Sequence, residues 1–272
     1  MRYLFVLVLV VACLPVTAQE LYIFTEPASN IPARALTAKY AGKALKNRLT
    51  DAIETRQMAE LQVGLNKKWM LKSSLSFSDM YTSAFRWESA KLYTKYRFLS
   101  KDEVHRHFRM AAFAEGSYSR NPLMFDELSI DGDQSGIRAG VVMTQLWHKL
   151  ALSSTLSYLE VLKDQPDGMH RILPQEAYTY SLSAGYLLFP RKYTSYKQTN
   201  LNLYAELLGQ QTVDVRKSYV DLAPGVQFIF ASTTKLNFGY RFQLNGNMDR
   251  MTRNSWLVSV EKTFLNSLKK KK

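Results

Sequence analysis

The sequence predicts an all-β fold, a transmembrane antiparallel β-barrel of about 12 strands with short periplasmic turns and longer external loops. Three observations indicate this fold. Apolar and polar residues alternate along the chain after residue 18, short and long connections alternate, and no later apolar run is long enough for a membrane-spanning helix. A strand with a two-residue period has one apolar and one polar face. In a membrane barrel the apolar faces point outward to lipid.

Residues 1–18 predict a signal peptide. An apolar run follows the single base Arg2, and small residues lead to a cleavage site after Ala18. The run is too short to cross the hydrocarbon layer, which takes about 20 residues. The alternative interpretation is a lipoprotein with Cys13 lipidated. Cys13 is the only cysteine in the sequence, so we expect no disulfide in the exported chain.

Residues 19–32 fit neither a helix nor a strand. The stretch QELYIFTEPASNIPAR begins with an apolar LYIF, but Pro27 and Pro32 lack the backbone N–H that a spanning strand needs. The LYIF residues are too apolar to extend freely into water. We therefore expect a periplasmic N-terminal segment that folds against the periplasmic mouth or enters the lumen as a partial plug.

The barrel itself is predicted over residues 33–265. In the segment KLNFGYRFQLN, Phe238 and Tyr240 share one face with other apolar residues, whereas Asn237 and Arg241 lie on the opposite, polar face. Similar segments recur, each of roughly the ten residues that a tilted membrane strand needs. They cover residues 35–43, 58–66, 68–78, 89–99, 109–118, 136–147, 149–161, 177–189, 199–209, 218–230, 235–245 and 255–264.

The connections predict the orientation of the barrel. Those after even-numbered strands are short, at residues 66–67, 100–103, 148–149 and 232–234, with one longer connection at 190–198. Outer-membrane barrels have short periplasmic turns and longer external loops. The pattern predicts both termini in the periplasm and localisation to the outer membrane of a Gram-negative bacterium. The longer, polar connections are residues 45–57, 79–85, 119–135, 162–176, 210–217 and 245–253.

The C-terminal strand carries a resemblance to known barrels. It ends on the aromatic Phe264, as the last strand of Gram-negative outer-membrane barrels usually does, although a basic tail at residues 266–272 follows. Trp147 and Trp256 stand near strand ends, where aromatic residues favour the membrane interface. The chain resembles Bacteroidota-type single-domain outer-membrane β-barrels, and LYIFTEPASNIPAR resembles the opening of one uncharacterised family among them. The resemblance implies the fold and no particular function.

The inward faces predict a basic lumen. The whole chain has a formal net charge of +13, and the inward bases outnumber the inward acids. A basic lumen favours anions, which predicts a passive channel for small anionic or polar solutes. The competing interpretation is a closed barrel, filled by ion pairs, that serves as a structural or accessory subunit of an envelope complex. The predicted lumen-lining residues are Lys39, Lys72, Lys91, Lys95, Arg97, Arg109, Glu115, Arg138, Glu206, Lys235 and Arg241.

Other bases predict contacts with lipid. Basic residues assigned to the external loops are expected to bind phosphates of outer-leaflet lipid, including lipopolysaccharide. The basic tail is interpreted as a solvated end, with contact to acidic lipid or a periplasmic protein as the alternative. Dispersed charges on an exported chain do not predict binding to nucleic acid. The external bases are Lys46, Arg48, Arg56, Arg216, Arg250 and Arg253.

The histidines provide little evidence for catalysis or metal binding. His105 and His107 have a spacing that can chelate a metal, but no third ligand is identifiable nearby. For His148 and His170, a catalytic triad would require spatial contacts that the sequence does not reveal. An outer-membrane hydrolase is therefore the third hypothesis. No catalytic residue, metal ligand or cofactor is predicted.

One predicted loop is rich in acids. Asp126, Glu127, Asp131 and Asp133 could together bind Ca²⁺, but their spacing differs from that of the EF-hand. We therefore interpret this segment as a solvated external loop.

Overall fold

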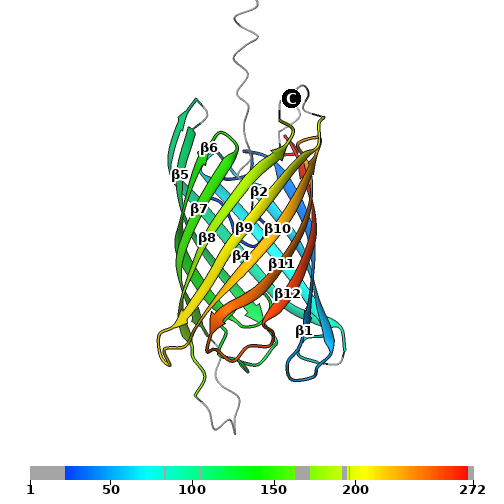
Figure 1. Cartoon of the computed structure of the whole chain (residues 1–272), viewed down its shortest axis with the longest axis vertical. Coiled ribbons are helices and arrows are strands. Elements are labelled where there is room, and N and C mark those ends of the chain that lie inside the picture. The colour runs from blue at the N-terminus through cyan, green and yellow to red at the C-terminus, as the bar shows by residue number, and fades with distance from the viewer. Residues whose placement is uncertain are drawn as a thin grey trace, which may run out of the picture.

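The computed structural model describes residues 22–82, 84–104, 106–162, 172–191, 195 and 197–268. Twelve antiparallel strands form one closed barrel, in which each strand pairs with its neighbours in the chain and β1 pairs with β12 (Figure 1). The predicted fold class is confirmed. The strands are β1 (Leu36–Lys46), β2 (Ile53–Gly64), β3 (Trp69–Ser78), β4 (Arg86–Glu103), β5 (Arg106–Ser119), β6 (Gly136–Trp147), β7 (Leu150–Val161), β8 (Glu176–Phe189), β9 (Asn200–Thr212), β10 (Ser218–Phe230), β11 (Thr234–Gly246) and β12 (Asn254–Phe264).

The barrel is apolar outside and polar inside. Along β12, Trp256 and Val258 are exposed, whereas Ser255 and Ser259 are buried. The same alternation places charged side chains such as Lys95 in the interior. An apolar outer surface of this extent is stable against lipid and unfavourable in water. Within the described residues, no helix is long and apolar enough to cross a membrane.

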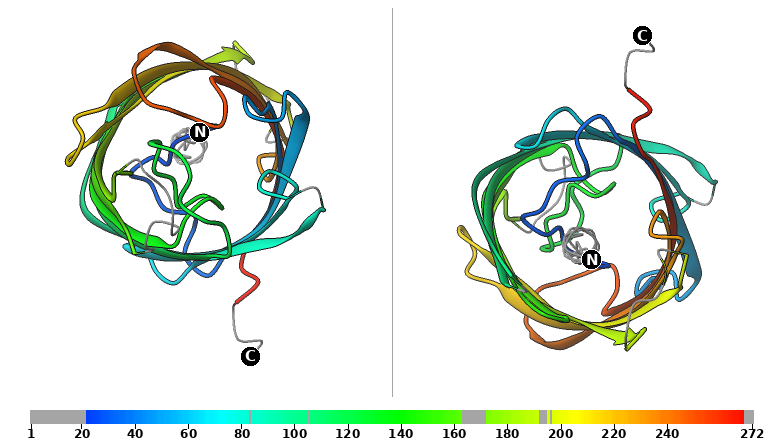
Figure 2. Two further views of the ribbon diagram at one scale, coloured as in Figure 1. Left: turned by 90° about the horizontal axis from the view of Figure 1, so that it is seen from below. Right: turned by 90° about the horizontal axis from the view of Figure 1, so that it is seen from above.

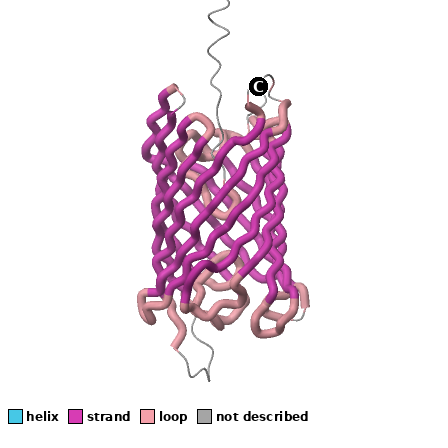
Figure 3. Tube along the Cα trace, in the orientation of Figure 1, coloured by secondary structure: helices cyan, strands magenta, loops and turns pink. Residues whose placement is uncertain are grey.

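The two ends of the barrel differ. The start of β1, the end of β12 and the connections at 65–68, 148–149 and 231–233 share one end, which we call the short-turn end (upper end in Figure 1). The opposite end carries the connections 79–85 and 120–135 and is called the long-loop end. Figure 3 shows loops at both ends and within the barrel.

The structure corrects the predicted turn at residues 100–103. These residues belong to β4, which pairs with β5 as far as Glu103, well beyond Tyr96, where the pairing of β4 with β3 ends (Figure 1). A register shift between Arg97 and Leu99 interrupts the two-residue alternation at this point. Asp102 accepts a hydrogen bond from Arg109 at 2.9 Å, which supports the extended hairpin.

The first long connection is also shorter than predicted. β1 and β2 continue pairing as far as Lys46 and Ile53, which leaves a loop of residues 47–52. Asn47 stabilises the turn, because its side chain donates to Glu54 at 2.7 Å and accepts from the Leu49 amide at 2.9 Å. Glu54 and Arg56, at the start of β2, therefore face the lumen from a strand.

Some sequence predictions concern residues outside the described part of the chain. These are the leader at 1–18, residues 19–21 of the N-terminal segment, His105, His170 and the lysines at 269–272. The described part of the tail forms a turn in which the Leu268 amide donates to the Arg34 carbonyl at 3.2 Å.

Candidate functional site: the lumen between two inserted segments

Two segments from opposite ends of the barrel occupy the lumen (Figure 2). Residues 22–35, here called the N-terminal segment, enter from the short-turn end. Residues 120–135, here called the inserted loop, join β5 to β6 and enter from the long-loop end. Both segments carry buried apolar side chains, such as Ile23 and Leu128, inside the polar wall.

Glu206 on β9 holds the beginning of the N-terminal segment. Its carboxylate accepts hydrogen bonds from the amides of Ile23 at 2.9 Å and Phe24 at 3.0 Å, and from the Thr25 hydroxyl at 2.7 Å. Glu206 is completely buried and forms no ion pair with the residues that the structure describes. A buried carboxylate requires several donors, and here the segment supplies most of them.

Two lysines hold the middle of the N-terminal segment. Lys72 lies 2.8 Å from Glu26, and the Lys95 ammonium donates to the carbonyls of Pro27 at 2.7 Å and Ser29 at 2.9 Å. Burial alone would raise the pKa of Glu26, but the charges of Lys72 and Lys95 outweigh it and hold this pKa below its ordinary value. Glu26 is therefore ionised at neutral pH.

Two glycines shape the wall around the same segment. Gly225 on β10 and Gly239 on β11 are cross-strand partners. A Cβ atom at Gly225 would lie 2.3 Å from Ile23 Cδ1, and one at Gly239 would lie 2.5 Å from Phe24 Cε2. Larger residues would therefore clash with the N-terminal segment, so the wall is complementary to it in shape.

The inserted loop is anchored first through Arg56. The Arg56 guanidinium forms two hydrogen bonds of 2.7 Å with Glu88 on β4 and a third of 2.7 Å with Asp133 of the loop. Arg56 and Glu88 are each 1% exposed. The paired geometry and the loop contact allow these charges to be buried.

A second cluster anchors the loop to the wall formed by β10 and β11. Glu127 lies 3.2 Å from Arg241 and 2.9 Å from Arg250, and Arg250 also pairs with Asp221 at 2.7 Å. Burial would raise the pKa of Glu127, but the two arginines outweigh it and lower the pKa to about 2. Gln210 adds hydrogen bonds to both the amide and the carbonyl of Leu128.

These contacts correct two predictions. Arg56 and Arg250 were assigned to external, lipid-binding positions, but both are buried inside the barrel. Arg56 points inward because β2 starts before the predicted position, and Arg250 reaches back to Glu127 and Asp221. Asp126, Glu127 and Asp133 of the inserted loop are not solvated as predicted, because bases pair with them, whereas Asp131 pairs with Lys91 and stays half-exposed. Asp126, for example, pairs with Lys217 at 2.7 Å.

We expect Glu127→Gln to destabilise the barrel in a pH-dependent way. The ordinary pKa is 4.5 and the folded-state pKa is about 2. A lowered pKa stabilises the fold above the ordinary value, and this contribution is lost as the pH falls from about 4.5 towards 2. The loss at pH 7 should be on the order of 3 kcal/mol, because one pKa unit corresponds to about 1.4 kcal/mol. Urea unfolding of both proteins at pH 7, 5 and 3 measures it.

The exposed Asp51 provides the control for this experiment. It pairs with Lys46 at 2.7 Å, but its side chain is 85% exposed, so Asp51→Asn should change stability little at any pH. A Glu127→Gln effect of equal size at all three pH values would contradict the assigned ion pairing.

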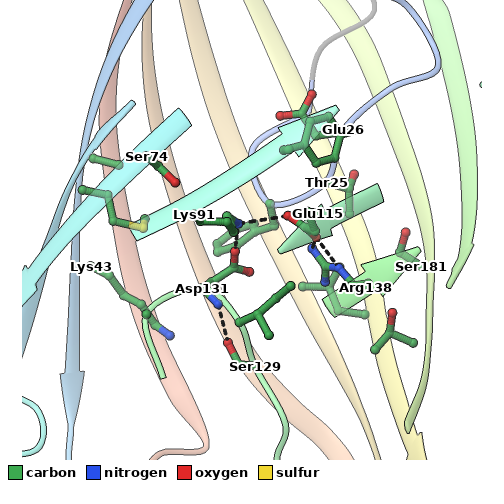
Figure 4. A pocket seen from close by; sticks show the side chains of 18 of the residues that line it. Thr25, Glu26, Lys43, Ser74, Lys91, Glu115, Ser129, Asp131, Arg138 and Ser181 are labelled. Atoms are coloured by element: carbon green, nitrogen blue, oxygen red, sulfur yellow. Dashed lines mark hydrogen bonds and ion pairs between the residues drawn. The ribbon is translucent and has the colours of Figure 1, made fainter. Parts of the chain in front are cut away.

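A chamber of about 310 Å³ lies between the two inserted segments. Residues 23–26 and 127–132 contribute to its lining, and the strands supply the rest. Seven bases and five acids are among the described lining residues, which leaves an excess of positive charge. Figure 4 shows Lys91 of the chamber between Glu115 and Asp131, and Arg138 paired with the same Glu115.

The structure places the predicted lumen residues in two main groups. One group lines the chamber and the other contacts the N-terminal segment. Lys235 lies apart in a buried pair with Glu261, and Arg97 donates to the Lys67 carbonyl at 2.8 Å near the short-turn end. The chamber group is Lys39, Lys72, Lys91, Glu115, Arg138 and Arg241, and the contacts of the N-terminal segment include Lys72, Lys95, Arg109 and Glu206.

Sequence reasoning missed a further base of the chamber, Lys43 on β1. Lys43 has the same parity as Lys39, so extending the alternation to the end of that predicted strand would have identified it. Arg56 and Glu26 also line the chamber. Glu26 lies outside the strands, where the two-residue period does not predict whether a side chain points into the lumen.

The histidines of the described chain do not form a metal site. No group of three or more His, Cys, Asp or Glu residues suited to a metal ion occurs among the residues that the structure describes. His107 Nδ1 lies 2.9 Å from Asp102, in the extended β4–β5 hairpin. His148 occupies the β6–β7 turn with a φ of 52°.

Comparison with known proteins identifies the fold. No protein-family model matches the chain, and no curated protein matches it. An outer membrane channel from Pseudomonas putida F1 is 12% identical with a TM-score of 0.60, over 89% of this chain and 100% of that chain. The NanC porin is 11% identical with a TM-score of 0.53, over 84% of this chain and 98% of that chain. At these identities the similarity is one of fold.

Proposed function

We propose that this protein is a passive channel for small polar or anionic solutes in the outer membrane of a Gram-negative bacterium. The observation that carries the proposal is the chamber inside the lumen, in whose lining bases outnumber acids. A basic chamber concentrates anions. The names of the two similar structures, a channel and a porin, support a transport function rather than an enzymatic one.

The two inserted segments have different parts in this proposal. The inserted loop is the fixed constriction, because its acids pair with buried bases of the wall, as Asp133 does with Arg56. The N-terminal segment is the removable plug, because no strand continues through it and water can replace its hydrogen bonds to Glu206 and Lys95. The plug lies on the periplasmic side, where the short turns and the start of β1 are assigned.

Planar-bilayer recording tests the channel. We expect the purified full-length protein to give discrete current steps in symmetric KCl. In a KCl gradient, the reversal potential should indicate preference for Cl⁻ over K⁺, because the chamber has excess positive charge. A fully inserted protein that stays silent, even after removal of residues 21–30, would exclude the channel.

A second candidate function follows from the closure of the lumen. Buried pairs such as Arg56–Glu88 and Arg250–Asp221 resemble the ionic networks that fill small structural barrels. A barrel closed in this way would serve as a structural or accessory subunit of an envelope complex. Silent bilayers together with reproducible co-purification of an envelope protein would favour this second function.

A further inference from the structure

Most bases of the chamber are neutralised by a nearby acid. Lys72 lies 2.8 Å from Glu26, and Lys91 lies 3.3 Å from Glu115. The arginines of the chamber are similarly paired, as Arg56 is with Glu88. Paired bases contribute little net field to a solute, so the excess positive charge must lie elsewhere in the wall.

Two lysines of β1 account for this excess. Lys39 and Lys43 line the chamber, and the side chain of neither forms a hydrogen bond or ion pair with any residue that the structure describes. They stand at inward positions on either side of Ala41. At about 3.3 Å of rise per residue, their Cα atoms are roughly 13 Å apart. Side chains of this length therefore cover a continuous stretch of the β1 wall.

The acids nearest to Lys39 in the sheet are engaged by other bases. Its cross-strand partners are Glu60 on β2 and Glu261 on β12. Glu60 lies 3.6 Å from Lys72, and Glu261 pairs with Lys235. Lys39 thus forms no ion pair with either of these acids, and its ammonium is available to an external anion.

The acids within electrostatic range of Lys43, Asp133 and Glu127, are likewise engaged by arginines. The cross-strand partners of Lys43 are Arg56, which is engaged by Glu88 and Asp133, and Leu257. Figure 4 shows the Lys43 side chain extending into the pocket, with no marked interaction at its nitrogen. An ammonium in a confined site without a counterion is unfavourable, and a bound anion relieves this cost.

The opposite wall of the chamber carries hydroxyl groups. Thr155 and Ser157 on β7 and Thr179 and Ser181 on β8 line it. β7 is six strands away from β1 in the ring of twelve, so these hydroxyls face the β1 lysines across the lumen. Figure 4 accordingly shows Ser181 and Lys43 on opposite sides of the pocket.

We infer that Lys39 and Lys43 are the residues that select anions in this channel. They supply the charge for a small carboxylate or phosphate, and the hydroxyls of β7 and β8 bind the polar remainder of the same solute. This inference rests on the proposed channel function and names its selectivity-determining residues. The other bases of the lumen mainly hold the two inserted segments and one another.

The first test measures selectivity in Lys39→Gln/Lys43→Gln. In a KCl gradient, the ratio of Cl⁻ to K⁺ permeability should fall at least two- to fourfold, because each unit charge at 5–8 Å in water changes the energy of one ion by about 0.5–0.8 kcal/mol. Lys46→Gln is the matched control. Lys46 lies on the same strand but has a side chain 58% exposed outside the chamber, so the ratio should not change. An unchanged ratio in the double variant would overturn the inference while the channel itself stands.

A second test does not depend on conductance. Cys13 is the only cysteine and lies in the predicted leader, so Lys43→Cys introduces a single thiol into the processed chain. An anionic sulfonatoethyl methanethiosulfonate should modify this thiol several times faster than a cationic trimethylammonium reagent of similar size. Adding Lys39→Gln should remove the difference. Equal rates in the single variant would overturn the anion site, and a retained preference in a silent barrel would reject the channel function alone.

Discussion

Deleting residues 21–30 should raise the single-channel conductance severalfold. The deletion removes the segment that Glu206, Lys72 and Lys95 hold inside the lumen. It leaves β1, which starts at Leu36, and therefore leaves every strand pair of the barrel in place. Current through a narrow pore depends on its smallest cross-section, so removal of a segment that fills the lumen has a large effect.

The N-terminal segment fits closely against the barrel wall, where two glycines leave room for its side chains. Gly225 and Gly239 accommodate Ile23 and Phe24 at distances that exclude a Cβ atom. Gly239→Leu should therefore displace the segment in a chain of full length, and its conductance should approach that of the deletion. This variant separates the position of the segment from any effect of shortening the chain.

Controls for the deletion come from the opposite terminus. Removing residues 269–272 changes length and charge without touching a described contact of the lumen, so conductance should match the full-length protein. Correct folding is checked by the heat-dependent shift of the barrel on gels. A folded deletion variant with the conductance of the full-length protein would show that the N-terminal segment does not limit the current.

The strands were predictable because their signal is local. Side chains in a strand alternate between its faces, so each of the twelve segments shows its outward and inward residues without reference to the rest of the chain. β12 shows this clearly, with Trp256 outside and Ser255 inside. Only the strand limits were missed. A register shift lengthened β4, and the Asn47 turn shortened the first loop.

The filling of the lumen was less predictable because its contacts join distant residues. Glu206 and Ile23 are 183 positions apart, and Glu127 and Arg250 are 123 apart. The alternation of β9 predicts that Glu206 points inward, but it does not identify the residues to which Glu206 binds. The inserted loop and the N-terminal segment have no two-residue period, so the pattern could not show that their acids point into the lumen. One sequence feature does point to this pairing: the loop at residues 119–135 is rich in acids, and the lumen that it can enter is rich in bases.

Arg56→Ala should produce the largest loss of stability among the substitutions discussed. It would leave Glu88 buried without its guanidinium partner, with neutral donors such as Asn121 at 2.5 Å and Ser76 at 3.3 Å. Removing one member of a buried ion pair typically costs about 3–5 kcal/mol. Asp133 would lose the same partner, so the inserted loop would be loosened as well. Urea unfolding in detergent, followed by tryptophan fluorescence, measures the loss.

A second variant shows whether the loss of stability comes from the unpaired charge of Glu88 or from the lost contacts of the inserted loop. Replacing both members, as in Arg56→Leu/Glu88→Leu, leaves no unpaired charge on the strands, so much of the stability should return. Arg48→Ala is the control, because Arg48 and Asp249 are 3.6 Å apart with side chains 43% and 38% exposed, and such pairs contribute about 1 kcal/mol or less. A double variant as unstable as Arg56→Ala would show that neutralising Glu88 is not the main role of the guanidinium. Its bonds to the inserted loop, at Asp133 and at the Asp131 carbonyl, would then account for the stability of the barrel.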